Sequence, residues 1–155
     1  MNLTAQLAKH LRDVHFGGNW TWSNLKDQLS DVTWQEATTK VDSFNTILTL
    51  FYHSTYYVGV QLNVLKGGPL DAKDELSFRH PEVHSQEEWI ALQQQAWDNA
   101  EQLAKLIEAL PDSKLEEDFT EKKYGTYYRN IAGMIEHLHY HLGQIALLKQ
   151  LVRKK

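Results

Sequence analysis

The 155-residue sequence predicts an all-α protein, a four-helix bundle with a long crossover between its second and third helices. Three observations lead to this prediction. Apolar residues recur at three- and four-residue intervals in four tracts. No segment alternates with a period of two residues or contains an Asn-Gly or Asp-Gly hairpin turn. Residues 67–84 separate the second tract from the third. The length fits one domain, which we expect to span residues 1–155.

The first tract is short and amphipathic. Its apolar positions follow helical spacing: Leu3, Leu7, Leu11 and Val14. Gly17-Gly18 then interrupts the pattern. We expect the helical pattern to resume at Trp20 and Trp22 and to continue to Leu29.

The second long helix is expected from about Asp42 to Lys66, and Gly67-Gly68-Pro69 ends it. One continuous stripe comprises Phe44, Ile47, Leu48, Phe51, Thr55, Val58, Leu62 and Leu65. The opposite side is also apolar and surrounds a histidine: Leu50, His53, Tyr57, Val60 and Val64. A helix that is apolar on both sides is usually central in its fold.

The connection at residues 67–84 contains His80 and His84, which are four residues apart. Pro81 disfavours helical structure at the preceding residue, so this spacing does not place the two histidines on one face. We interpret both as loop histidines. Connections of this length are often functional, which leaves open a role as a lid or cleft wall.

Capping residues mark three further helix starts. Thr33 with Glu36, and Ser85 with Glu88, have the spacing of a capping box. The second pair opens a third long helix, expected from Gln86 to Ala109. Residues 112–123 are polar and are expected to form a loop with one helical turn, after which Thr126 is the predicted N-cap of the fourth helix.

Composition excludes several classes of protein. The net charge of −4 gives no electrostatic basis for binding nucleic acid, and the basic residues at 149–155 are explained by the preference of helix C-termini for cations. The chain has no cysteine, which excludes thiolate ligands, disulfides and a cysteine nucleophile. No apolar run reaches the ~20 residues of a membrane span, and the N-terminus lacks signal-peptide features. We therefore expect a soluble, cytoplasmic protein.

The strongest chemical signal is a pair of histidines in the fourth helix. His137 and His141 are four residues apart, so their imidazoles project from one face and can chelate one metal ion. His139 points about 200° away from His137. A third ligand is needed, and His53 is the one histidine in the predicted second helix. Three histidines with an open position suit Zn²⁺, Ni²⁺ or Fe²⁺.

Other metal and phosphate motifs do not fit. A zincin requires His-Glu-x-x-His, but Leu138 follows His137. A ferritin-type di-iron site requires two Glu-x-x-His pairs, and only Glu136 and His139 match. The two Gly-Gly sequences lack the spacing of a phosphate-binding loop.

These features resemble the DinB-like (DinB/YfiT) metalloenzyme superfamily. The resemblance rests on His53 in the second helix and on His137 and His141 followed by Gly143-Gln144-Ile145. It implies an up-down-down-up bundle, a divalent metal held by these three histidines, and often a homodimer. Characterised relatives transfer low-molecular-weight thiols or isomerise thiol adducts. Relatives often have arginine before Gly-Gln-Ile; this chain has Leu142, which cannot contact an anion as arginine would.

The combined interpretation is a metal-dependent enzyme that acts on a small molecule, with thiol transfer or a related hydrolysis as the expected reaction. The metal would activate a low-molecular-weight thiol or water. Candidate residues around the metal are His15, Trp20, Tyr57 and Gln144. The alternative is a non-catalytic structural or interaction protein whose histidines brace the bundle. A homodimer is expected, because three tryptophans and the two-sided second helix offer excess apolar surface: Trp20, Trp22 and Trp34.

Overall fold

The computed structural model describes residues 1–154, which are largely helical. In chain order the helices are α1 (Leu3–Phe16), α2 (Leu25–Leu29), α3 (Trp34–Thr38), α4 (Ile47–Leu65), α5 (Asp74–Ser77), α6 (Gln86–Glu108), the 3₁₀ helices η1 (Asp112–Glu116) and η2 (Lys122–Tyr124), and α7 (Tyr127–Arg153). The described residues form no strand, only an isolated antiparallel bridge between Asp118 and Thr126. None of their helices is both long enough and apolar enough to cross a membrane.

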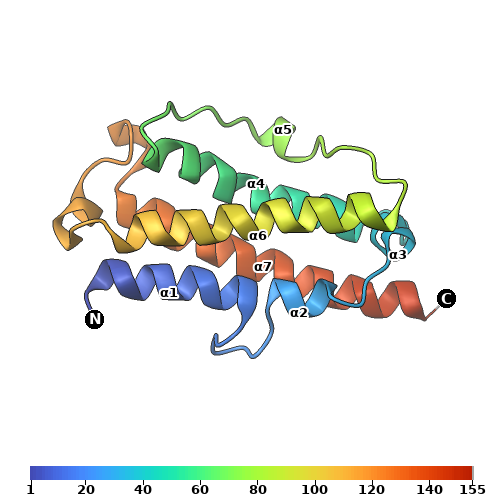
Figure 1. Ribbon diagram of the computed structural model, residues 1–155. Coiled ribbons are helices and arrows are strands. Elements are labelled where there is room, and N and C mark those ends of the chain that lie inside the picture. Colours follow the sequence, from blue (N-terminus) through green and yellow to red (C-terminus); the bar gives the residue numbers. More distant parts are fainter. Residues whose placement is uncertain (155) are drawn as a thin grey trace.

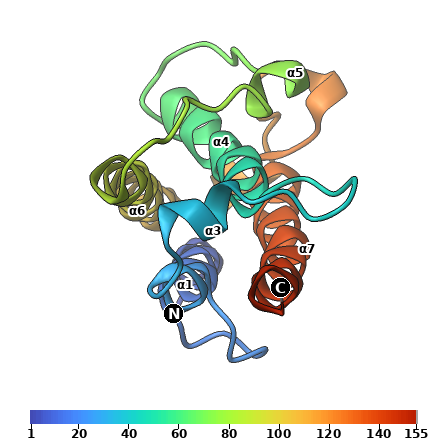
Figure 2. The same ribbon diagram turned by 90° about the vertical axis from the view of Figure 1, so that its right-hand side faces the viewer.

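The four long helices α1, α4, α6 and α7 form a bundle (Figure 1). Each packs against two others, in the order α1, α6, α4, α7 and back to α1, as the end-on view shows (Figure 2). In Figure 1, α1 and α7 run in one direction and α4 and α6 in the other. Because α4 and α6 are parallel, the chain between them must return along the whole bundle. The predicted all-α bundle with a crossover between its second and third long helices is confirmed.

Aromatic side chains fill the centre of the bundle between α4 and α6. Trp89 is fully buried, and its indole N–H donates a hydrogen bond of 3.0 Å to the carbonyl of Val32. Phe51 makes edge-to-face contacts with Trp89 and Trp97, at centroid distances of 5.6 and 5.5 Å. Burial of a side chain such as Phe51 contributes roughly 1.5–3 kcal/mol. This packing fixes the face that α4 turns toward α7.

The predicted helix starts at Thr33, Ser85 and Thr126 are confirmed. Thr33 and Glu36 form both hydrogen bonds of a capping box. The side chain of Ser85 accepts from the backbone N–H of Glu88, and α6 then extends from Gln86 to Glu108. Thr126 likewise accepts from the backbone N–H of Arg129. Local capping chemistry was therefore a sound guide to where these helices begin.

The predicted start of the second long helix at Asp42 was wrong. The chain is irregular up to Thr46, whose hydroxyl accepts from the backbone N–H of Thr49 at 3.1 Å and caps α4. Asp42 has a φ of 46°, outside the helical region. Phe44, which was expected in the buried stripe, is 55% exposed. The helix therefore begins after the N-cap Thr46, although the apolar pattern of the sequence extends before this residue to Phe44.

The predicted helical pattern from Trp20 was also wrong. α1 ends at Gly17, whose φ of 109° is readily adopted only by glycine. The chain then forms an exposed loop, and α2 begins only after Asn24, whose side chain caps it. Trp20 and Trp22 are 95% and 90% exposed at the surface of this loop.

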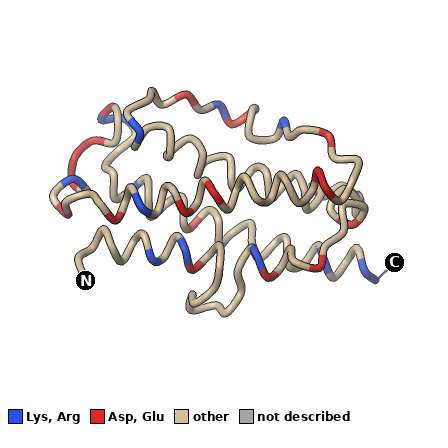
Figure 3. The backbone as a smooth tube through the Cα atoms, in the orientation of Figure 1, with Lys and Arg blue, Asp and Glu red and all other residues tan. Residues whose placement is uncertain are grey.

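Ion pairs hold the C-terminal end of α7 against the α2–α3 region. Lys149 contacts Asp31 at 2.6 Å, and Arg153 contacts Asp31 and Glu36 at 3.0 and 2.8 Å. Hydrogen bonds from Lys149 and Arg153 lower the pKa of Asp31 to about 2. Figure 3 shows basic and acidic residues close together at this end. The basic residues at positions 149 and 153 thus have structural partners within the fold.

Candidate metal centre

Three histidines meet where α4 packs against α7. α4 contributes His53, and α7 contributes His137 and His141; we call these residues the histidine triad. The Nε2 atom of His137 lies 3.1 Å from the Nε2 atom of His53 and 3.1 Å from that of His141. One ligand atom from each residue lies within 4.8 Å of the other two. The structure therefore brings together the three predicted ligands.

Hydrogen bonds behind the triad fix two of its tautomers. Ser77 Oγ donates to the carbonyl of Asp74 at 2.5 Å, so it must accept from His53 Nδ1, which is 2.7 Å away. His141 Nδ1 donates to the side-chain oxygen of Gln144, also at 2.7 Å. A neutral imidazole with a proton on Nδ1 carries its lone pair on Nε2. Both rings therefore direct lone pairs toward His137.

This arrangement fits a divalent cation. A proton on His137 Nε2 could satisfy only one of the two lone pairs that face it, whereas one cation could accept all three nitrogens. Two imidazole nitrogens at about 2.0–2.1 Å from one ion, at interligand angles of about 90–110°, lie about 2.9–3.4 Å apart. The two separations of 3.1 Å fall in this range. No Asp or Glu among residues 1–154 completes the group as a fourth ligand.

Burial favours the neutral, ligating form of the triad. Desolvation, followed by the proximity of His141 and His53, lowers the pKa of His137 to about 4. Desolvation and the nearby His141 also lower the pKa of His53. Desolvation lowers the pKa of His141, against the opposing hydrogen bond to Gln144. All three imidazoles are thus neutral at physiological pH, as metal binding requires.

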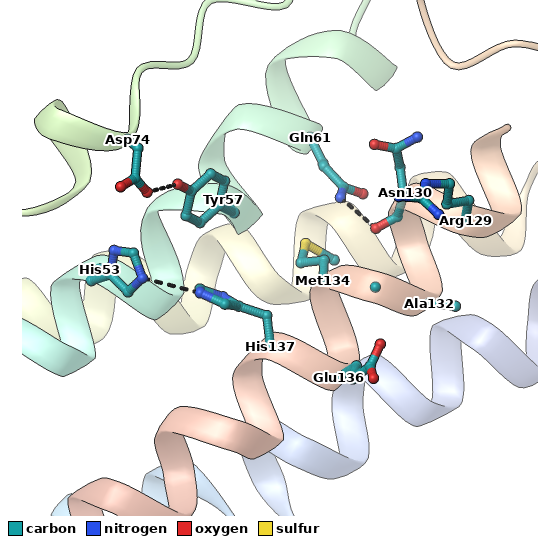
Figure 4. Close-up of a pocket in the computed structure, with 11 residues that line it drawn as sticks. His53, Tyr57, Gln61, Asp74, Arg129, Asn130, Ala132, Met134, Glu136 and His137 are labelled. Atoms are coloured by element: carbon teal, nitrogen blue, oxygen red, sulfur yellow. Dashed lines mark hydrogen bonds between the residues drawn. The ribbon is translucent and has the colours of Figure 1, made fainter. Parts of the chain in front are cut away.

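A cavity of about 650 Å³ opens beside the triad, between the first half of α7, α4 and the crossover. His53 and His137 line one end of it, and Arg129 lines the other (Figure 4). His141 is not among the lining residues and is only 8% exposed. His53 is also buried, at 6% exposed, and His137 is half-buried, so a small molecule in the cavity would meet the triad chiefly at His137.

Tyr57 and Asp74 form the wall next to the triad. The Tyr57 hydroxyl donates a hydrogen bond of 2.5 Å to Asp74 Oδ1, as Figure 4 shows. The ring of Tyr57 contacts the rings of His53 and His137 edge-on, at 5.7 and 5.2 Å. Desolvation and the hydrogen bond to Asp74 raise the pKa of Tyr57 to about 12. Tyr57 therefore stays protonated at neutral pH.

Comparison with models of protein families decides the classification. Residues 19–145 match the model of the DinB superfamily, which is most of the chain. The chain belongs to the DinB superfamily. No curated protein and no solved structure matches it. The triad occupies the helices on which the resemblance to DinB-like proteins had placed it.

Two of the four residues predicted to surround the metal lie there in this DinB protein. Tyr57 lines the cavity, and Gln144 orients His141. The predictions for His15 and Trp20 were wrong. His15 is fully buried on α1, where its Nδ1 donates to the carbonyl of Leu11 at 2.8 Å and its ring packs against Trp97. Trp20 is exposed because the helix expected there does not form.

The other histidines of this DinB protein have separate environments. His139 lies on the opposite face of α7, as predicted; its Nδ1 donates to the carbonyl of Ile135, and its ring stacks on His10. In the crossover, His80 contacts Thr49 at 3.1 Å, and His84 contacts Glu82 at 3.0 Å.

Three residues of the site were not predicted from the sequence: Asp74, Ser77 and Arg129. Asp74 and Ser77 belong to α5, a single short helix within the crossover. The only sequence signal was the length of the connection, which allowed it a role as cleft wall. The structure confirms that role, because Asp74 lines the cavity and Ser77 holds His53.

Proposed function

We propose that the protein is a metal-dependent enzyme that acts on a small molecule, with transfer of a low-molecular-weight thiol or a related hydrolysis as its reaction. One observation carries this proposal: three neutral imidazoles converge beside an open cavity without a carboxylate as fourth ligand. Catalytic sites characteristically keep such a position open, whereas structural zinc sites close it with protein. Zn²⁺, Ni²⁺ and Fe²⁺ all suit three histidines.

A divalent ion held by the triad would lower the pKa of a coordinated thiol or water and so supply a nucleophile near neutral pH. The protein's own groups have supporting roles. Ser77 and Gln144 keep the proton on Nδ1 of His53 and His141, which leaves Nε2 free to ligate. Tyr57 stays protonated at neutral pH and gives its one hydroxyl proton to Asp74, so its oxygen can accept a hydrogen bond from a substrate in the cavity. Asp74 orients the Tyr57 hydroxyl.

The alternative is a structural protein in which the triad, with or without metal, braces α4 against α7. The cavity argues against it, because two residues of the triad line the cavity and one of them, His137, is only half-buried. A purely bracing cluster has no need of an accessible face.

The two functions can be separated with the metal-loaded protein. The protein would be loaded separately with Zn²⁺, Ni²⁺ and Fe²⁺ and incubated with a panel of low-molecular-weight thiols and electrophilic small molecules. Consumption of the thiol and formation of product would be measured. We expect turnover that disappears in the His137→Ala variant. Absence of turnover with every metal and substrate, together with a melting temperature that rises on metal binding, would favour the bracing role instead.

We also propose that the protein forms a homodimer. The interface would comprise the loop that carries Trp20 and Trp22 and the exposed residues Tyr140 and Leu147 of α7. Trp20 and Trp22 are almost fully exposed, and Asn19 in the same loop lies 3.2 Å from His139 Nε2 of α7. Residues 137–148 of α7 contain no charged side chain, although Tyr140 and Leu147 are 65% and 58% exposed. Interface centres are similarly poor in charge and rich in aromatic residues. A second copy can meet such a surface without charge repulsion.

Trp34, which was expected to contribute to this interface, is partly buried against the core. Light scattering at micromolar concentration should report a dimer for the wild type and a monomer for a double Trp20→Ser, Trp22→Ser variant. A monomeric wild type would contradict the proposal.

A further inference from the structure

We propose that Arg129 binds a carboxylate of the substrate, at the opposite end of the cavity from the histidine triad. This inference rests on the proposed function and names the class of substrate. The molecule would carry its reacting group, such as a thiol, at one end and an anionic group at the other.

Arg129 differs from the other arginines of the chain. Arg12 pairs with Glu101 and Glu108, Arg79 with Glu75, and Arg153 with Asp31 and Glu36. Within residues 1–154, the guanidinium of Arg129 makes no ion pair or hydrogen bond. It nevertheless lines the cavity. Its planar array of N–H donors is suited to a carboxylate, which it can bind through two parallel hydrogen bonds.

The backbone on which Arg129 rests supports its position. A Cβ atom at Gly125 would lie 2.6 Å from Arg129 Cδ, so the stem of the arginine packs directly over this glycine. Gly125 has a φ of 78°, which also favours glycine. In addition, Gln61 of α4 donates to the carbonyl of Asn130 at 2.8 Å and holds the first turn of α7 in place. The arginine therefore projects from an anchored turn.

Asp74 and Arg129 lie at opposite ends of the cavity (Figure 4). Asp74 lies at the triad end, where it accepts a hydrogen bond from Tyr57, whereas the carboxylate of Glu136 points away from His137 (Figure 4). Arg129 is the cationic side chain among the lining residues, and it lies at the far end (Figure 4). A ligand with one anionic end would avoid Asp74 and place that end at Arg129.

The floor between the two ends is open. Gly133 lies midway between Arg129 and His137 on α7 and lines the cavity, and a Cβ atom there would meet no atom within 4 Å. Eight residues of helix span about 12 Å, some of which the long arginine side chain can bridge. The ligand is accordingly an elongated molecule that passes over Gly133.

Two matched probes test the assignment. In 6-mercaptohexanoate and 6-mercaptohexanamide the thiol and chain are identical, and only the terminal charge differs. The protein would be loaded with Co²⁺, and each thiol titrated while the thiolate-to-cobalt charge-transfer absorption is followed. We expect the carboxylate probe to bind about tenfold more tightly than the amide. Arg129→Gln should abolish this preference without changing the affinity for the amide, and Arg129→Lys should retain part of it.

Lys122→Gln is the matched control, because it removes a positive charge near the start of α7 from a residue that does not line the cavity. It should keep the wild-type preference. Equal affinities for the two probes in the wild type, or a preference that survives in Arg129→Gln, would overturn the role of Arg129 and leave the metal centre intact. Absence of the absorption band with both probes would instead reject the proposed thiol chemistry, and this inference with it.

Discussion

α7 carries two groups of histidines on opposite faces, and they differ in where their nitrogens point. In the histidine triad, Nε2 atoms approach one another to 3.1 Å. On the other face, the rings of His10 and His139 stack at 5.4 Å, and the nitrogens of His139 contact the Ile135 carbonyl and the Asn19 amide. Proximity of imidazoles is therefore a poor criterion for a metal site; convergence of their lone pairs is the better one.

The largest expected difference between the two groups is in metal binding. His137→Ala and His141→Ala should each reduce affinity for Zn²⁺ more than about 100-fold, because two imidazoles cannot replace three. His139→Ala should bind metal as the wild type does. Elemental analysis after dialysis would measure the difference, with circular dichroism to verify that each variant folds. Retention of metal by both triad variants would show that the ligands lie elsewhere.

A smaller effect is expected from the residues that orient the rings. Ser77→Ala and Gln144→Ala should each lower metal affinity about 10- to 100-fold, because the Nδ1 protons of His53 and His141 lose their acceptors. Asn19→Ala, which removes the side-chain partner of His139, is the matched control and should leave affinity unchanged. Competition with a chromophoric chelator would measure all three. Wild-type affinity in Ser77→Ala would mean that packing alone orients His53.

The smallest effect concerns the pH dependence of stability without metal. Burial lowers the pKa of His137 to about 4, and unfolding restores the ordinary value near 6.5. Between these values the unfolded chain binds more protons than the folded one, so stability falls as the pH decreases from about 7 to 4. His15, whose pKa burial also lowers to about 4, acts in the same direction.

The melting temperature of the metal-free protein should therefore decline over this range, and His137→Gln should make the decline shallower, since His15 still contributes. Thermal melts from pH 8 to pH 4.5 would compare the two. Identical slopes in both proteins would show that His137 does not titrate differently in the folded state.

Residues whose environment depends on helical periodicity could be predicted from the sequence. The four-residue spacing of His137 and His141 fixes their common face, and the same geometry places His139 on the opposite one. Tyr57 follows His53 by one helical turn, and Gln144 follows His141 by three residues, so both lie beside the triad. For these residues, the positions expected from helical spacing agree with those in the folded structure.

Residues placed by loops could not be predicted in this way. The tryptophans at positions 20 and 22 fit a helical pattern, yet Gly17 and the cap at Asn24 leave them in an exposed loop. Ser77 reaches His53 across 24 positions of sequence through a crossover without a periodic pattern. Arg129 lies in the first turn of α7, and nothing in the sequence indicates that a cavity lies beside it.

The crossover from α4 to α6 is both a wall of the cavity and a support for residues that could hold an ion. It reaches the site through the hydrogen bonds from His53 to Ser77 and from Tyr57 to Asp74. Linkage is reciprocal: if docking of this segment strengthens ion binding, ion binding must strengthen docking by the same free energy. Local unfolding of residues 66–85 then becomes rarer in the loaded protein, and a protease would cut there more slowly. Detachment of this segment would widen the entrance to the cavity and would also weaken the binding of an ion by the triad. Easier access to the site would therefore come with weaker retention of a metal.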